Sequence, residues 1–339
     1  MKPILFRSPL LHRNFVHARH QFIELVRSSP GGKVIALVGP THAGKSLIVE
    51  SLLRTLESDL RPTEPATMPL IHLVVATSND GRVSPKHLTL KLLKAVKHPL
   101  FEHEGEMDER DYYRPSRGRD EGSMRVALEA ALDYRNTILV VLDEAHHLTH
   151  TKNRELRSNV LQSIKCLCAI KRTLVLVGGY ELAYQGLFDS AHFAGRLACI
   201  ELPPYVANAI DLDEWDRILK FCSKYVPVSP ASLLIDNADD LLEATNGCFG
   251  LLEKVLWFAR SIADGGVITK STLRAAFPTQ AEHSAIRSDI QAGQRALGNL
   301  KSHEMREEPT SFLKRTHRQK PFKRKPNRVL PTYPEVANE

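Results

Sequence analysis

The sequence contains no apolar run close to the roughly 20 residues that cross a bilayer, and residues 1–13 lack the apolar stretch of a secretory signal. We therefore expect a soluble, cytoplasmic protein with no membrane partner. Cysteine is also scarce, and the five cysteines lie mostly in apolar segments without the paired spacing of a metal site. We expect them to be reduced, buried side chains: Cys166, Cys168, Cys199, Cys222 and Cys248. The sequence has no internal repeat.

The composition is that of an ordinary globular chain. Of 339 residues, 42% are hydrophobic and 25% are charged, which argues against wholesale disorder. The length suits about two domains plus extensions. The formal net charge of +7 is concentrated near the C-terminus, because residues 314–328 contain eight Lys or Arg and no acid. Three interpretations of this basic segment remain open: it contacts phosphates, it contacts an acidic protein, or it is only solvated.

Short apolar runs alternate with helical patterns over the first two thirds of the chain. Five runs have the continuous apolar character of buried strands: 34–38, 70–76, 138–142, 174–177 and 197–202. Helical spacing of apolar residues separates them: 46–57, 85–96, 124–134 and 154–170. This alternation predicts an α/β fold with a parallel sheet that helices cover on both faces.

The remaining patterns set the domain boundaries. A lead-in helix is predicted over 14–27, with Asn14 as its N-cap. After Pro203 and Pro204 the strand signals stop, and only helical patterns follow. The expected parts are a lead-in region (1–30), an α/β core (31–204) with an exposed insertion (102–122), a small all-helical domain (205–283), and a C-terminal helix with a basic, disordered tail (284–339).

The segment from Gly39 to Ser46 fits the pattern G-x-x-x-x-G-K-[ST]. It follows a buried strand and opens a helix, which is the context that this phosphate-binding pattern needs. The glycines let the backbone curl around phosphate oxygens, and Lys45 adds a positive charge on the outer phosphates. Ser46 offers a hydroxyl to Mg²⁺. The predicted ATP-binding residues are Gly39, Pro40, Thr41, His42, Ala43, Gly44, Lys45, Ser46 and Leu47.

A second acidic site follows another buried strand, as a P-loop requires. Asp143 and Glu144 directly follow the apolar run 138–142. We expect Asp143 to hold Mg²⁺ through water and Glu144 to polarise the attacking water as general base. Together with Lys45, this pair predicts an ATPase that converts ATP and water to ADP and phosphate. In the alternative, the two carboxylates only cap the next helix, which leaves the P-loop without its metal partner.

Residues 143–146 also spell the acidic motif of one helicase group. A helicase motor closes its nucleotide site with a second RecA-like domain, whereas only helical patterns follow Leu202. The strand ending at Val177 continues into Gly178 and Gly179 rather than into the Ser-Ala-Thr link of that group. A translocating helicase is therefore disfavoured.

These motifs resemble the AAA+ regulators of bacterial transposition, the TniB/TnsC type, over about residues 15–263. Four stretches carry the resemblance: they are similar to the family's acidic motif (141–148), its fourth strand (174–181), its arginine-bearing segment (193–196) and the Leu-Pro turn that follows (201–204). The resemblance implies a P-loop AAA+ core with a parallel five-stranded sheet in the order 5-1-4-3-2, followed by a small all-helical lid.

The resemblance also implies a function. It implies an ATP-dependent homo-oligomer, a ring or a filament, that coats double-stranded DNA without strong sequence preference. The oligomer would link a target-selector protein or complex to transposase subunits, with slow, regulatory hydrolysis dismantling the assembly. A rival hypothesis is an ATP-gated DNA-binding scaffold, or a replication-initiator-like switch, with little turnover. Glu144 argues for hydrolysis, whereas Gly178 and Gly179, in place of a polar sensor residue, favour a slow rate.

Several basic residues receive roles that have an open alternative. By the resemblance, Arg196 stabilises the γ-phosphate, reaching into a neighbouring subunit's site; otherwise it is a surface arginine. Lys254 falls where many AAA+ proteins place a phosphate-sensing arginine; otherwise it faces solvent. DNA contacts are assigned to four arginines in and just after the insertion, which are otherwise only solvated: Arg114, Arg117, Arg119 and Arg125.

Two further segments have competing interpretations. His146 and His147 are interpreted as packing at a helix start and as groups that support the neighbouring site residues, rather than as metal ligands, because Asp143 is committed to Mg²⁺ and no further ligand is in range. The tail from 314 to 333 is expected to dock onto a transposase subunit, or else to bind DNA electrostatically.

Overall fold

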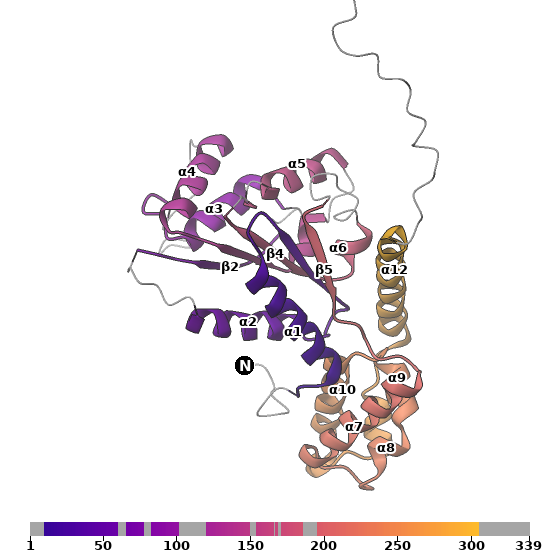
Figure 1. The fold of residues 1–339 in the computed structure, drawn as a ribbon. Helices are drawn as coiled ribbons and strands as arrows, with labels where there is room; N and C mark the ends of the chain where they lie inside the picture. Colours follow the sequence, from indigo (N-terminus) through magenta and orange to yellow (C-terminus); the bar gives the residue numbers. More distant parts are fainter. Residues whose placement is uncertain are drawn as a thin grey trace, which may run out of the picture. The chain divides into compact units, whose positions relative to one another are not determined.

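Figure 1 shows the computed structural model. It describes residues 10–59, 66–77, 83–101, 120–149, 154–165, 167–168, 171–185 and 195–304. The chain divides into two units, Met1–Leu297 and Gly298–Glu339, and the elements discussed below belong to the first, apart from the last turns of one helix. Three features of the sequence lie outside the described residues: most of the insertion (102–119), the basic tail (305–339) and Cys166.

A five-stranded parallel sheet forms the centre of the α/β part. Its strands are β1 (Val34–Val38), β2 (Leu70–Val74), β3 (Leu139–Asp143), β4 (Thr173–Gly178) and β5 (Leu197–Glu201). The order across the sheet is β2-β3-β4-β1-β5, so the predicted order 5-1-4-3-2 is confirmed, read from the other edge. Every residue of β1, β3 and β4 is buried, whereas the edge strands are partly exposed. The continuously apolar runs are thus explained by burial on both faces.

Parallel pairing brings the carboxyl ends of the strands to one edge of the sheet. Val38 at the end of β1 pairs with Gly178 on one side and with Glu201 on the other, and Val74 pairs with Asp143. Segments that follow the ends of neighbouring parallel strands lie together. The loop after β1, the acidic residues after β3 and the glycines after β4 therefore meet at this edge.

Helices cover both faces of the sheet (Figure 1). They are α1 (Arg13–Ser28), α2 (Lys45–Asp59), α3 (Pro85–Ala95), α4 (Glu121–Tyr134), α5 (Arg154–Lys165), the single turn α6 (Glu181–Tyr184) and the 3₁₀ helix η1 (Ala145–Thr149). Helices α1 and α2 contact each other and the central strands, while α3, α4 and α5 pack together on the other face. Phe15, Phe22, Ile48 and Leu52 are buried between α1, α2 and the sheet.

The N-terminal helix begins one residue earlier than the sequence predicts. Its N-cap is His12, whose Nδ1 accepts from the Phe15 amide, so the prediction of Asn14 as cap was wrong. The Asn14 side chain instead donates to the carbonyl of Pro203, 3.0 Å away. His12 Nδ1 also accepts from the Tyr205 hydroxyl at 2.9 Å. Both contacts tie the start of α1 to the segment after β5.

The chain after β5 is helical and has its own hydrophobic core. Its elements are α7 (Ala209–Tyr225), α8 (Leu233–Asp236), α9 (Ala238–Ala244), α10 (Phe249–Ser261), the 3₁₀ helix η2 (Asp264–Gly266) and α11 (Lys270–Ala275). Trp215, Leu219, Leu252 and Leu256 lie in this core. Helices α8 and α9 are separated by a break at Asn237. The side-chain amide of Asn237 donates to the Leu233 carbonyl, and the backbone of Asn237 is not helical. Asparagine side chains often compete with backbone groups for the hydrogen bonds of a helix.

Helix α12 (Gln280–Glu304) follows, and its residues up to Leu297 belong to the first unit. Gly293 allows a close approach to Tyr180, since a Cβ at that position would lie 2.1 Å from the tyrosine ring. Asp289 accepts from the Tyr184 hydroxyl at 2.9 Å. Helix α12 therefore packs against the segment that follows β4.

The prediction that the cysteines are buried is confirmed only in part. Among the cysteines that the structure describes, Cys168, Cys222 and Cys248 are buried and free, as predicted, but Cys199 is exposed because it lies on the edge strand β5. In the described part of the chain, no helix is both long enough and apolar enough to span a bilayer.

Candidate nucleotide-binding site

The loop from Gly39 to Lys45 connects β1 to α2 and curls at the carboxyl edge of the sheet. Two of its residues have left-handed backbone, Gly44 with φ of 97° and His42 with φ of 58°. A Cβ on Gly39 would lie 2.6 Å from the Leu202 carbonyl oxygen, so only glycine fits there. The turn leads directly into α2, so the first backbone amides of this helix lie at the end of the loop. Amides at a helix N-terminus can bind a phosphate.

Lys45 is held across its own loop. Its Nζ donates to the carbonyls of Gly39 at 3.0 Å and Pro40 at 2.7 Å. Burial lowers the pKa of Lys45, while the carboxylates of Glu144 and Asp143 oppose that shift. The ammonium therefore lies close to the acidic pair, and a phosphate would offer it stronger, charged acceptors than the two carbonyls.

Asp143 is the last residue of β3 and is only 7% exposed. Its Oδ1 accepts from the amide of Glu144 at 2.8 Å, which fixes the carboxylate at the strand end. The strand order puts β4 alone between β3 and β1. The structure thus brings Asp143 to the same edge as Lys45 and Ser46, with a hard oxygen donor of the kind that Mg²⁺ prefers.

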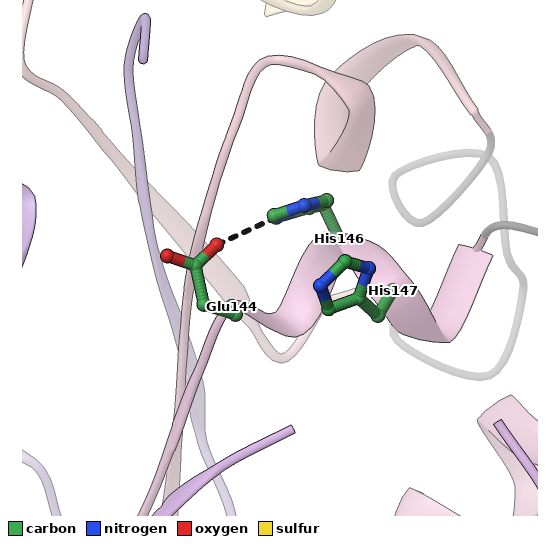
Figure 2. A group of neighbouring side chains, drawn as sticks. All are labelled: Glu144, His146 and His147. Carbon is green, nitrogen blue, oxygen red and sulfur yellow. Dashed lines mark ion pairs between the residues drawn. The ribbon is translucent and has the colours of Figure 1, made fainter. Parts of the chain in front are cut away.

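Glu144 leaves the strand with left-handed backbone, with φ of 53°. A non-glycine residue pays a conformational cost in this region. The turn directs its side chain, which is 47% exposed, toward His146, whose Nδ1 lies 3.3 Å from Glu144 Oε2 (Figure 2). His147 is the third side chain of this group. The sequence analysis assigned the two histidines to packing and to support of the neighbouring site residues, and the structure places them beside the carboxylate of Glu144.

The lid touches the P-loop through α10. The amide of Gly250 donates to the His42 carbonyl at 3.0 Å, and a Cβ on Gly250 would lie 2.2 Å from that oxygen. Lys254 lies one turn further along α10 and pairs with Glu282 at 3.9 Å. The pKa of His42 is lowered mainly by burial and further by the charges of Lys254 and Lys45. Lys254 is therefore near the loop, with its side chain 57% exposed.

A residue that the sequence analysis missed lies after β4. A Cβ on Gly179 would lie 2.0 Å from Glu181 Oε2, so the Glu181 carboxylate occupies the space that a side chain at 179 would fill. The charge of Glu181 also opposes the lowering of the Lys45 pKa, which puts it within electrostatic reach of the P-loop. The available signal was a glutamate two residues after a pair of glycines at a strand end.

Arg196 directly precedes β5 and lies at the amino-terminal end of the strands, whereas the P-loop lies at their carboxyl end. Its carbonyl accepts from the amide of Val34, the first residue of β1, and its side chain is exposed. The four residue steps from Val34 to Val38 span roughly 13 Å of strand. Arg196 therefore does not join the site formed by Lys45.

The arginines assigned to DNA have different outcomes. Arg114, Arg117 and Arg119 lie outside the described residues. Arg125 is on α4, where it donates to Glu121 Oε1 and Ser163 Oγ, both at 2.6 Å. These bonds hold its partly buried guanidinium against α5 and beside an acid, so its charge is partly neutralised before any phosphate approaches.

Comparisons with known proteins agree with this geometry. Residues 29–184 match the family described as AAA domain. Similar solved structures include the Aeropyrum pernix ORC2 protein (15% identity, TM-score 0.53, covering 84% of this chain and 72% of that one) and Cdc6p from Pyrobaculum aerophilum (17%, 0.53, 81% and 70%). The Aeropyrum pernix ORC1 protein in complex with DNA is a third (16%, 0.52, 80% and 67%).

None of the curated proteins matches this chain in sequence. The matched family, the strand order and the P-loop together define the class: the chain has the α/β P-loop AAA+ fold, with helices after the core. At the identities found, the solved structures bear on the fold alone.

Proposed function

We propose that this protein is an ATP-dependent, DNA-binding AAA+ ATPase that assembles on duplex DNA and links target-site selection to a transposase. One observation carries the ATPase: the partly buried ammonium of Lys45 lies at the end of the strands where Asp143 and Glu144 emerge. A positive charge for phosphates, an acid for Mg²⁺ and a second carboxylate for water are the groups that ATP hydrolysis needs.

The residues fit ATP and Mg²⁺. Gly39 has no room for a side chain, and Gly44 adopts a backbone that favours glycine, as a phosphate cradle requires. Ser46 and Asp143 are hard oxygen donors suited to Mg²⁺. Bound Mg²⁺ would offset charge on the phosphates, and the residues from Gly39 to Leu47 would hold the nucleotide.

The chain's own groups then divide the work. Lys45 stabilises the outer phosphates, and a Glu144 carboxylate oxygen takes the proton from the attacking water. Glu181 accepts a hydrogen bond from the same water, in place of the polar side chain that Gly179 lacks. Lys254 contacts the nucleotide from the lid. Because the charged Glu181, and not a neutral polar side chain, fills the sensor position, we propose that turnover is slow and regulatory.

The oligomer completes the site. Arg196 is exposed and lies at the end of the strands opposite its own P-loop, so we propose that it acts on the γ-phosphate of a neighbouring subunit in a ring or filament. DNA binding is supported by the similar fold of the Aeropyrum pernix ORC1 protein in complex with DNA. We assign the phosphate contacts to the arginines at 114, 117, 119 and 125, with Arg125 the weakest because Glu121 pairs with it.

A second candidate is an initiator-like switch, and the fold similarity to ORC and Cdc6 proteins favours it. Both candidates bind DNA when ATP is bound. They differ in partner: the transposition regulator binds transposase subunits and a target-selector protein or complex, whereas the switch does not.

The test is DNA binding by the purified full chain with ATP, ADP or no nucleotide, using random-sequence duplex and electron microscopy of the products. Glu144→Gln serves as the trapping variant, because it retains ATP binding but lacks the base. We expect ordered oligomers on DNA only with ATP, and longer-lived ones with Glu144→Gln. Capture of a transposase by these oligomers supports the first candidate. Binding by a monomer without nucleotide contradicts both.

A further inference from the structure

Glu144, His146 and His147 bring three ligand atoms together beside the nucleotide site (Figure 2). All three side chains are partly exposed, and their ligand atoms lie within 4.8 Å of one another. In the described part of the chain, this is the one group of three or more His, Cys, Asp and Glu residues with such spacing. We propose that it binds a divalent transition-metal ion of the zinc class, and that this ion inhibits the ATPase by occupying Glu144. The inhibition rests on the proposed function; the binding does not.

The distances suit a small transition-metal ion. Zinc binds imidazole nitrogen and carboxylate oxygen at about 2.0–2.2 Å, so two ligand atoms of a tetrahedral site are about 3.4 Å apart. His146 Nδ1 and Glu144 Oε2 are 3.3 Å apart. Because all three ligand atoms lie within 4.8 Å of one another, no pair needs to close by more than roughly 1.4 Å, which rotation of the partly exposed side chains can supply.

The backbone holds the three residues in place. Glu144 turns out of β3 with positive φ, and η1 starts directly after it at Ala145. The tight 3₁₀ turn keeps the adjacent imidazoles near each other, with ring centroids 4.3 Å apart and ring planes at 44°. Three ligands from four consecutive positions are therefore partly preorganised, and water can complete the coordination.

The ligand chemistry separates this site from the Mg²⁺ site. Two imidazoles and one carboxylate favour zinc, nickel or copper, whereas Mg²⁺ prefers an all-oxygen set. The Asp143 carboxylate, which is the proposed Mg²⁺ ligand, accepts a hydrogen bond from the Glu144 amide and is not part of this group of three side chains. A zinc-class ion at Glu144 would block proton transfer from the attacking water without displacing the nucleotide.

The first experiment measures binding directly, on tag-free full-length protein without nucleotide or Mg²⁺. Zinc uptake is followed by equilibrium dialysis, and Co²⁺ is used as a visible-absorption probe of tetrahedral coordination. We expect His147→Ala to bind zinc at least about tenfold more weakly than wild type, since one of three ligands is lost. His17→Ala, which removes an exposed histidine on α1, is the matched control and should bind as wild type does. Equal zinc binding by wild type and His147→Ala would overturn the site.

The second experiment measures ATPase activity in excess Mg²⁺ with increasing zinc. Zinc should inhibit wild type and the His17→Ala control alike, and a zinc chelator should restore activity. Relative to its own rate without zinc, His147→Ala should require at least about tenfold more zinc for half inhibition than wild type does. If His147→Ala unfolds, as judged by circular dichroism, His147→Gln replaces it.

The two experiments separate the possible failures. Loss of the ATPase proposal leaves zinc binding measurable without nucleotide. Zinc binding at Glu144 with unchanged hydrolysis would refute the inhibition and also the role of Glu144 as base. Inhibition that is identical in wild type and His147→Ala would show that zinc acts elsewhere, for example on ATP, and would refute the proposal.

Discussion

Lys45 holds a partly buried positive charge whose hydrogen-bond partners are two backbone carbonyls of its own loop. Lys45→Ala removes the charged donor but leaves the loop's backbone intact. A hydrogen bond to a charged group contributes about 1.5–3 kcal/mol, so we expect ATP affinity to fall by about a hundredfold, and ATP-dependent DNA binding to be lost with it. Titration calorimetry with a slowly hydrolysed ATP analogue measures this.

Lys33→Ala is the matched control for that change. Lys33 is exposed and directly precedes β1, so it lies at the far end of the strand from the loop. Its backbone contacts survive the substitution. A similar loss of ATP affinity in both variants would mean that net charge, and not the position of Lys45, determines binding.

We propose that Glu181 orients the attacking water, a role that its local sequence does not indicate. Glu181→Ala should lower kcat for ATP about tenfold with little change in KM, because a group that only orients water acts in the chemical step. Glu24→Ala, at an exposed site on α1, should leave kcat unchanged.

The double variant Gly179→Asn with Glu181→Ala tests the assigned position. Without the Glu181 carboxylate, a side chain at 179 has space, and its amide can accept from the water. Partial recovery of kcat supports the position. A wild-type rate for Glu181→Ala alone contradicts a role for this carboxylate.

At the scale of elements, α1 is held to the lid segment by a buried neutral histidine. Burial and the nearby charge of Arg13 lower the pKa of His12 to about 4, against about 6.5 in an unfolded chain. Between these values the unfolded state binds more protons than the folded state, so stability rises with pH through this window. We expect the free energy of unfolding to be about 2 kcal/mol lower at pH 5 than at pH 7.5 from this residue alone.

Urea unfolding at the two pH values checks this expectation. Other groups also titrate, so the comparison is with His12→Gln, which cannot gain a proton. The variant should show a pH dependence that is smaller by about 2 kcal/mol. An unchanged pH dependence in His12→Gln would mean that His12 is not kept neutral by burial.

The contact between α10 and the P-loop depends on one glycine. In Gly250→Ala the new Cβ would lie 2.2 Å from the His42 carbonyl oxygen, so α10 and the loop must separate by about 1 Å. Displacements of this size disturb binding geometry strongly, and we expect ATP affinity to fall at least about tenfold. Gly298→Ala, where a Cβ meets nothing within 4 Å, is the control. Equal affinities in the two variants would show that the lid contact does not shape the loop.

At the scale of the whole molecule, local sequence patterns predicted those elements whose residues are all equally buried. The strand 34–38 is apolar throughout because both of its faces are covered, and the P-loop and acidic motifs depend on short spacings. Contacts between distant segments carry no such signal. His12 caps α1 and binds Tyr205, which is 193 positions away, and the space for Glu181 exists because Gly179 has no side chain. The sequence therefore predicted the sheet and left these two roles to the structure.

The final prediction concerns the assembly, and it follows from the position of Arg196 at the edge of the sheet opposite its own P-loop. If Arg196 acts on a neighbour's nucleotide, Arg196→Ala has an intact base but receives no arginine, whereas Glu144→Gln supplies the arginine but lacks the base. Each variant alone should be inactive as an ATPase. In an equal mixture, about a quarter of the sites in a cyclic or helical assembly combine an intact base with an intact arginine.

The mixture should therefore regain about a quarter of the wild-type rate, measured as phosphate release on DNA. A mixture of Arg196→Ala with the double variant Arg196→Ala and Glu144→Gln contains no intact arginine and should remain inactive. A wild-type rate for Arg196→Ala alone would identify Arg196 as an ordinary surface residue. Failure of the first mixture to recover activity, while both variants still assemble on DNA with ATP, would exclude a shared site. Recovery would mean that hydrolysis requires the oligomer, because neither subunit then holds a complete site.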